Sequence, residues 1–177
     1  MAMVRKPIIL QIVGFQNSGK TTVVKKLIQR LAAENFNVAT IKHHGHGGKP
    51  DIVEEKDSSQ HIASGACASL IEGDGRILLQ AEKHSWSLCE QISILKILQT
   101  DIILIEGHKQ AAYPKIVLVR DEEDLYHLSK LKNIQSVFFW NKEWLEQKCQ
   151  LQSVPFFYIN DNLGYEWIYN YLTNELK

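Results

Sequence analysis

Nine consecutive residues, Gly14 to Thr22, have the types and spacing of a phosphate-binding loop, G-x-x-x-x-G-K-[ST]. Gly14 and Gly19 leave room for the backbone to curl around an anion, so that successive N–H groups can point at it. We expect Lys20 to reach the β- and γ-phosphates and the Thr21 hydroxyl to ligate Mg²⁺. The predicted nucleotide-binding residues are Gly14, Phe15, Gln16, Asn17, Ser18, Gly19, Lys20, Thr21 and Thr22.

Glu106 is the first candidate for the acid that completes a magnesium site. It ends the apolar run 102–105, so we expect it at the carboxyl edge of a sheet, where ligands bind in open α/β folds. Asp101 precedes the same run and would lie about 13–17 Å away along the strand, which makes it the poorer candidate. The alternative for Glu106 is a solvated loop acid.

Asp57 is the second acidic candidate. It follows the second predicted strand, in the region where nucleotide-binding folds commonly place a loop that senses the γ-phosphate. It could hold Mg²⁺ through water or orient the attacking water, and it could equally cap the helix that starts at Ser58. The predicted catalytic residues are Lys20, Asp57 and Glu106, and the predicted metal ligands are Thr21, Glu106 and Asp57.

A glycine-rich loop over residues 42–50 holds three histidines and two lysines. The spacing of His43, His44 and His46 lacks the arrangement of a helical zinc site, and no cysteine lies nearby, so solvated imidazoles are favoured over a metal site. A third interpretation is a surface for a second phosphorylated ligand, made of Lys42, His43, His44 and Lys49.

Base selection has two partial signals. Asn141-Lys142 follows a predicted strand, as in the N-K-x-D motif of many GTPases, but Trp144 stands where that motif has its aspartate. Asn160-Asp161, after the last predicted strand, could supply the acid instead. These residues leave the choice between guanine and adenine open.

The elements that must position these residues alternate between strands and helices, a pattern that predicts a mostly parallel sheet with helices on both faces. Apolar runs predict strands at 8–13, 38–41, 101–107, 115–120, 135–140 and 156–159. Helical patterns cover about 19–34 with Ser18 as cap, 58–65, a stretch opened by Ser85 or Ser87, 121–130, 142–149 and 162–176. Residues 68–72 and 76–80 flank Gly73-Asp74-Gly75 and predict a β-hairpin with a three-residue turn. The expected fold class is α/β, a P-loop NTPase fold plus an antiparallel hairpin, in a single domain over residues 1–177.

Composition narrows the class of protein. The chain has 177 residues, of which 45% are hydrophobic, which is ordinary for a soluble globular protein. Lys plus Arg and Asp plus Glu number 20 each, so net charge gives no reason to expect nucleic acid as a partner. Three cysteines without C-x-x-C spacing argue against a disulfide framework, and we expect a cytoplasmic protein. No apolar run is long enough for a membrane span, and residues 1–7 do not resemble a signal peptide.

The ordered set of motifs resembles the MobB family of molybdopterin-guanine dinucleotide biosynthesis. The matching segments are Asn17 to Thr22, Thr40 to His44, Lys56 to Ser58 with Ser64 to Ala66, Ile105 to Lys109, and Pro114 to Ile116. The resemblance implies a GTP-binding, Mg²⁺-dependent dimer with weak GTPase activity. It further implies an adapter that works beside a MobA-type guanylyltransferase and molybdopterin or its molybdenum form. It suggests a second-ligand or partner surface of Lys42, His43, His44 and Lys109.

Slow hydrolysis fits a sequence in which no arginine finger or water-positioning glutamine is recognisable. The sequence does not predict where Arg76 and Arg120 lie in the fold. The alternative function is a small-molecule kinase on the same scaffold, with an acceptor near the histidine loop. Such kinases usually carry an arginine-rich lid over the phosphates, and the arginines of this sequence are not clustered, which argues against a kinase. A scaffold that binds no nucleotide is a more distant alternative.

Overall fold

A computed structural model describes residues 6–43, 57–144 and 154–176. Contacts divide the chain into two compact units, Met1–His43 with Ile92–Lys177 and His44–Gln91. The prediction of a single domain over residues 1–177 stays a prediction. Within the described ranges, no helix is both long and apolar enough to cross a membrane.

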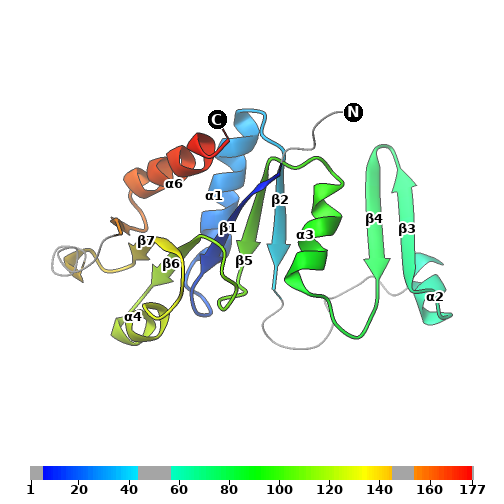
Figure 1. The fold of residues 1–177 in the computed structure, drawn as a ribbon, viewed down its shortest axis with the longest axis horizontal. Helices are drawn as coiled ribbons and strands as arrows, with labels where there is room; N and C mark the ends of the chain where they lie inside the picture. Colours follow the sequence, from blue (N-terminus) through cyan, green and yellow to red (C-terminus); the bar gives the residue numbers. More distant parts are fainter. Residues whose placement is uncertain (1–5, 44–56, 145–153, 177) are drawn as a thin grey trace. The chain divides into compact units, whose positions relative to one another are not determined.

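The first unit is built on a six-stranded sheet in the order β2-β5-β1-β6-β7-β8, in which every neighbouring pair is parallel (Figure 1). This confirms the predicted α/β class, and β1 lies inside the sheet because its apolar residues are buried on both faces. The strands are β1 (Ile8–Val13), β2 (Val38–Lys42), β5 (Ile102–Glu106), β6 (Lys115–Val119), β7 (Ile134–Phe139) and β8 (Phe156–Tyr158).

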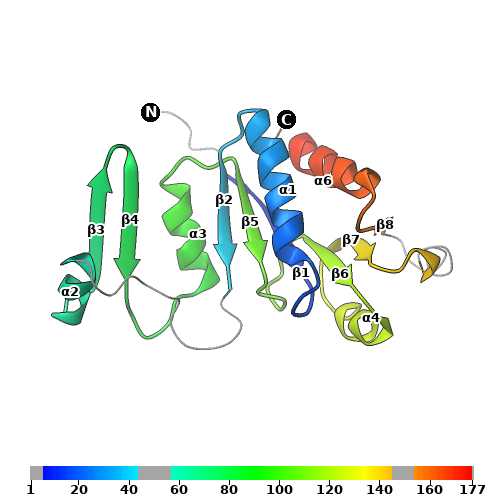
Figure 2. The ribbon, with the colours of Figure 1, turned by 180° about the vertical axis from the view of Figure 1, so that it is seen from behind.

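Helices cover both faces of this sheet. Side chains alternate along each strand, so Leu10 and Ile12 pack into one core with α1 (Lys20–Ala33) and α6 (Asn162–Asn174). Val13 points to the other core, which α4 (Glu122–Leu128) covers through Leu128. Figure 2 shows α1 and α6 in front of the sheet.

The second unit contains α2 (Asp57–Ala63) and an antiparallel hairpin of β3 (Ala68–Gly73) and β4 (Arg76–Ala81). The predicted three-residue turn is wrong, because Gly73 pairs with Arg76 and the turn is Asp74-Gly75 alone. Asp74 and Gly75 have φ of 49° and 75°, and a type I′ hairpin turn requires such positive values at both of its central residues.

Helix α3 (Leu88–Lys96) begins after Ser87, one of the two predicted caps. The Glu90 N–H donates to the Ser87 hydroxyl at 3.3 Å, and the Glu90 carboxylate accepts from the Ser87 N–H at 2.9 Å. This reciprocal pair is a capping box. Hydrogen bonds from Lys83 and then from Ser87 lower the pKa of Glu90 to about 2.

The predicted cap of α1 is wrong, and the described part of the predicted 142–149 helix is confirmed. Ser18 is not the cap of α1, because Gly19 occupies that position with a φ of 87° and no side chain caps the helix. Residues 142–144 are helical as predicted, and the rest of the predicted 142–149 helix lies outside the described residues.

Candidate functional site

The candidate site lies at the edge of the sheet where the parallel strands end. The loop from Gly14 to Gly19 leaves β1, and Glu106 ends β5 beside it. Arg120 directly follows β6 and Trp140 directly follows β7. Because all six strands run in the same direction, residues that are far apart in the sequence meet here.

The phosphate loop precedes the hydrogen-bond ladder of α1, and within the loop the Ser18 N–H donates to the Phe15 carbonyl oxygen at 3.3 Å. The first backbone hydrogen bond into α1 runs from Val23 N–H to Gly19 O at 3.0 Å, so the amides before Val23 precede the helical ladder. Asn17 and Gly19 have φ of 59° and 87°, which reverses the chain direction before the helix. The first turn of α1 carries no acidic residue, so no side chain of the helix itself offsets the positive end of its dipole.

Gly14 and Ser18 close the base of the loop. A Cβ atom at Gly14 would overlap the Ser18 hydroxyl oxygen and lie 3.1 Å from the Leu118 carbonyl oxygen. Ser18 is fully buried, and its hydroxyl has no hydrogen-bond partner among the described residues. Ser18 therefore packs beneath the loop, which explains why it does not cap α1.

Lys20 lies across the loop and donates from Nζ to the Phe15 carbonyl oxygen at 2.5 Å. Burial lowers the pKa of Lys20, Glu106 raises it in part, and the positive charges of Lys109, Lys42 and Arg120 lower it further. Four cationic side chains thus act on one loop, and such a cluster favours a multiply charged anion.

Thr21 and Glu106 form an oxygen pair beside the loop. The Thr21 hydroxyl donates to the Glu106 carboxylate, with oxygen distances of 2.9 and 3.1 Å. A hydroxyl and a carboxylate are ligands that suit Mg²⁺, so these residues fit the predicted metal. Lys42 Nζ lies 3.3 Å from Glu106 Oε1 and 3.4 Å from Thr21 Oγ1. The positively charged ammonium of Lys42 therefore already lies beside this oxygen pair. Asp101 lies at the other end of β5 and accepts from the Asn37 N–H at 2.8 Å.

The turn after Glu106 is held against β1. Gly107 has a φ of 97°, and its N–H donates to the Ile12 carbonyl oxygen at 3.0 Å. The buried Gln11 donates to the carbonyl oxygens of Gly107 at 3.2 Å and His108 at 2.9 Å. The rings of His43 and His108 lie 4.7 Å apart, and burial, followed by the charge of His43, lowers the pKa of His108.

Lys115 holds the rest of that loop, and no carboxylate among the described residues forms an ion pair with it. Its buried ammonium donates to the carbonyl oxygens of Ala111 at 2.8 Å, Tyr113 at 2.9 Å and Lys132 at 2.6 Å. Three acceptors satisfy its three donors, which makes the buried charge tolerable, although burial lowers the pKa of Lys115. Lys115 therefore fixes the loop from inside the fold.

Two further cations contact the first half of the phosphate loop. Arg120 donates from Nη1 to the Gln16 carbonyl oxygen at 3.0 Å, while its Nε and Nη2 bind the buried carboxylate of Asp124 at 2.8 and 3.0 Å. The Lys109 ammonium lies 3.7 Å from the centre of the Phe15 ring. Burial by itself raises the pKa of Asp124, but hydrogen bonds from Arg120 outweigh it, and the pKa is lowered.

Trp140 contacts the second half of the loop. Its indole N–H donates to the Ser18 carbonyl oxygen at 3.1 Å. The residues predicted to select a base act locally as helix caps: Asn141 Oδ1 accepts from the Glu143 N–H at 2.9 Å, and Asp161 Oδ1 accepts from the Leu163 N–H at 3.1 Å.

The structure brings together most of the predicted site residues. Lys20, Thr21, Glu106, Lys42 and Lys109 surround the phosphate loop, and His43 adjoins Glu106 through its backbone N–H. The backbone of Asp57 begins α2 in the second unit, and its side chain lies outside the described residues, as do His44, His46 and Lys49.

Sequence reasoning missed the supporting residues Gln11, Lys115, Arg120, Asp124 and Trp140. A polar residue inside the apolar run 8–13, and a lysine at the start of the apolar run 115–119, were usable signals for the first two. Arg120 and Trp140 contact the phosphate loop, and Asp124 binds Arg120, only through tertiary structure. No spacing in the sequence indicated these three residues.

This sheet order, with a glycine-bounded loop between β1 and α1 and a lysine at the start of α1, defines the fold of the P-loop NTPases. The family model for molybdopterin guanine dinucleotide synthesis protein B (MobB) matches residues 9–140. The chain belongs to the MobB family, as the resemblance of its motifs predicted.

Individual relatives agree. A Bacillus subtilis protein named as a probable molybdopterin-guanine dinucleotide biosynthesis adapter protein is 37% identical over 176 residues, covering 99% of each chain. The crystal structure of Bacillus subtilis MobB matches with a TM-score of 0.78 at 36% identity, over 92% of this chain and 96% of that one. A MobB homologue from Bacillus stearothermophilus matches with a TM-score of 0.75 at 32% identity, over 94% and 98%.

Proposed function

We propose that this chain binds GTP with Mg²⁺ and acts as an adapter in the synthesis of molybdopterin-guanine dinucleotide. The observation that carries the nucleotide part is the joint position of the phosphate loop, Lys20 and the Thr21–Glu106 oxygen pair. The loop amides and Lys20 would hold the phosphates, and Thr21 and Glu106 would hold the ion or its waters. Bound Mg²⁺ would neutralise charge on the β- and γ-phosphates. The pathway rests on the names of the family and its relatives.

Hydrolysis by this site is proposed to be slow. Arg120 is the described arginine that contacts the loop, and its guanidinium is engaged by Asp124 and by the Gln16 carbonyl oxygen. An arginine held in this way braces the loop and is not free to follow charge onto a transferring phosphoryl group. No contact among the described residues favours the small-molecule kinase alternative.

The proposed partners are a second copy of the chain, a MobA-type guanylyltransferase and molybdopterin or its molybdenum form. Lys42 and Lys109 add positive charge beside the phosphate loop, which suits an anionic second ligand. Large apolar side chains exposed on the hairpin support a protein partner there. They are Leu70, Ile71, Ile77, Leu78 and Leu79.

Calorimetric titration of GTP, GDP and ATP, with and without Mg²⁺, tests the nucleotide proposal. We expect GTP to bind more tightly with Mg²⁺ than without it, and more tightly than ATP. Lys20→Ala should weaken GTP binding more than tenfold, because a half-buried ammonium that can face the phosphates is removed. Unchanged affinity in Lys20→Ala would refute the assignment of the loop.

A further inference from the structure

The direction in which a nucleoside leaves the phosphate loop follows from the metal ligands. In a magnesium nucleoside triphosphate the ion bridges the β- and γ-phosphates. Thr21 and Glu106 hold their oxygen pair on the β5 side of β1, so the terminal phosphates belong on that side. Strands β6 and β7 follow on the other side of β1. The α-phosphate and the nucleoside therefore extend toward the ends of β6 and β7.

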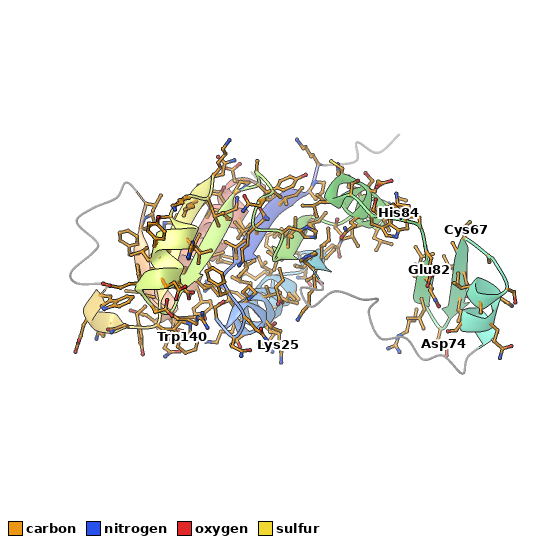
Figure 3. The ribbon with its side chains drawn as sticks, turned by 90° about the horizontal axis from the view of Figure 1, so that it is seen from below. Lys25, Cys67, Asp74, Glu82, His84 and Trp140 are labelled. Atoms are coloured by element: carbon orange, nitrogen blue, oxygen red, sulfur yellow. The ribbon has the colours of Figure 1, made fainter. Side chains whose placement is uncertain are left out.

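Trp140 is an exposed aromatic residue at that place, labelled in Figure 3. Its N–H edge faces the loop, since Nε1 donates to the Ser18 carbonyl oxygen and Cζ2 would lie 3.1 Å from a Cβ atom at Gly19. Even so, 42% of the residue remains exposed to solvent. An indole that is fixed along one edge and open elsewhere loses little further freedom when a flat ring packs on it.

The polar groups near Trp140 are engaged in local structure. Asn141 and Asp161 cap helical turns, and Asn160 Nδ2 donates to the Tyr158 hydroxyl at 3.1 Å. Each of these bonds uses one atom of the side chain, so Asn141 Nδ2 and Asp161 Oδ2 could still reach the edge of a base. Stacking on Trp140 uses none of these atoms, and it adds a contact with the face of the base.

We propose that Trp140 is the platform on which the base of a bound nucleotide stacks. The inference rests on the proposed nucleotide binding and adds a contact for the base. Every nucleobase has a π-face, so such a platform increases the affinity for nucleotides without selecting guanine over adenine. Choice of the base then lies with other residues.

The test compares ligands that share a polyphosphate but differ in having a base. Affinities for GDP, ADP and inorganic tripolyphosphate, each with Mg²⁺, are measured by calorimetry on the full chain and on Trp140→Ala and Trp140→Phe. A stacked base contributes about 1–3 kcal/mol, so Trp140→Ala should weaken both nucleotides between about fivefold and about a hundredfold. Trp140→Ala should weaken tripolyphosphate binding by less than it weakens nucleotide binding, because the lost loop contact with Ser18 acts on all three ligands and the lost stacking acts on the nucleotides alone. Trp140→Phe keeps an aromatic face but loses the N–H, and should retain most of the affinity for nucleotides.

The outcomes separate three possibilities. Equal weakening of tripolyphosphate and nucleotides in Trp140→Ala would mean that the indole only holds the loop, and would overturn the proposal. Unchanged nucleotide affinity in Trp140→Ala would overturn it as well. Failure of the unaltered chain to bind any of the three ligands would refute the proposed function, and the platform with it.

Discussion

At the residue scale, Gly14 is the position where the phosphate loop has no room for a side chain. Gly14→Ala would place a methyl group against the Ser18 hydroxyl and 3.1 Å from the Leu118 carbonyl oxygen, so the loop must shift. We expect GTP affinity to fall more than tenfold, about 1.4 kcal/mol or more, while the fold survives. Calorimetry and thermal unfolding measure the two effects.

Gly73→Ala is the matched control for that substitution. A Cβ atom at Gly73 meets nothing within 4 Å, and its φ is not in the left-handed region. The free energy of unfolding of Gly73→Ala should differ from that of the unaltered chain by no more than about 0.5 kcal/mol. Equal losses of stability in the two variants, with GTP affinity intact in Gly14→Ala, would contradict the role given to Gly14.

The lowered pKa of Lys20 predicts that anion binding by the phosphate loop depends on pH. Burial, and then the neighbouring cations, lower its pKa below the ordinary 10.5, whereas a bound polyphosphate favours the charged ammonium and raises that pKa. The affinity for tripolyphosphate should be full below the lowered pKa and should fall as the pH rises through it, at values below 10.5. Lys109 faces the same loop, and burial lowers its pKa too.

Calorimetry of tripolyphosphate from about pH 7 to about pH 10 measures this profile. Lys20→Gln should remove most of the change of affinity with pH. The profile of Lys109→Gln then shows how much of that change depends on Lys109. A profile of the unaltered chain that is as flat as that of Lys20→Gln would show that neither ammonium titrates against the bound anion.

At the element scale, the start of α4 braces the phosphate loop through one buried carboxylate. Asp124 is 2% exposed and accepts from the backbone N–H, Nε and Nη2 of Arg120, which in turn reaches Gln16. Asp124→Ala leaves these donors without their acceptor, so urea unfolding should show a loss of about 1–3 kcal/mol.

Glu123→Ala is the control on the same helical turn, because it removes an exposed acid. Its effect on the free energy of unfolding should stay within about 0.5 kcal/mol. If both variants lose the same stability, the Arg120–Asp124 pair has no special role and the brace is disproved.

At the scale of the whole molecule, the hairpin tests the proposed dimer. Leu70 and Leu79 are opposite each other in the strand register and are 57% and 49% exposed. Leu70→Glu together with Leu79→Lys replaces this apolar pair by an opposite-charge pair that the hairpin itself tolerates. Light scattering should then show a dimer for the unaltered chain and a monomer for the double variant.

Glu72→Lys changes an exposed charge on the same strand without removing apolar surface, and should remain dimeric. An unaltered chain that is monomeric would exclude the dimer. A double variant that stays dimeric would place the interface away from this pair.

The sequence by itself determined the features that depend on neighbours along the chain. The phosphate loop between an apolar strand and an amphipathic helix, the Asp74-Gly75 region as a hairpin turn, and Glu106 at the end of β5 all rest on local spacing. Because parallel strands end at one edge of a sheet, that local information also predicted that Glu106 would lie beside the loop, where it binds Thr21.

Only the tertiary structure decided which residues support the loop. Arg120 reaches Gln16 across 104 positions of the chain, and Trp140 reaches Ser18 across 122. Such contacts depend on which strands are neighbours in the sheet, and the chain alone does not state that order. Ser18 is the clearest case: its local pattern predicted a helix cap, but packing beneath Gly14 buried its hydroxyl.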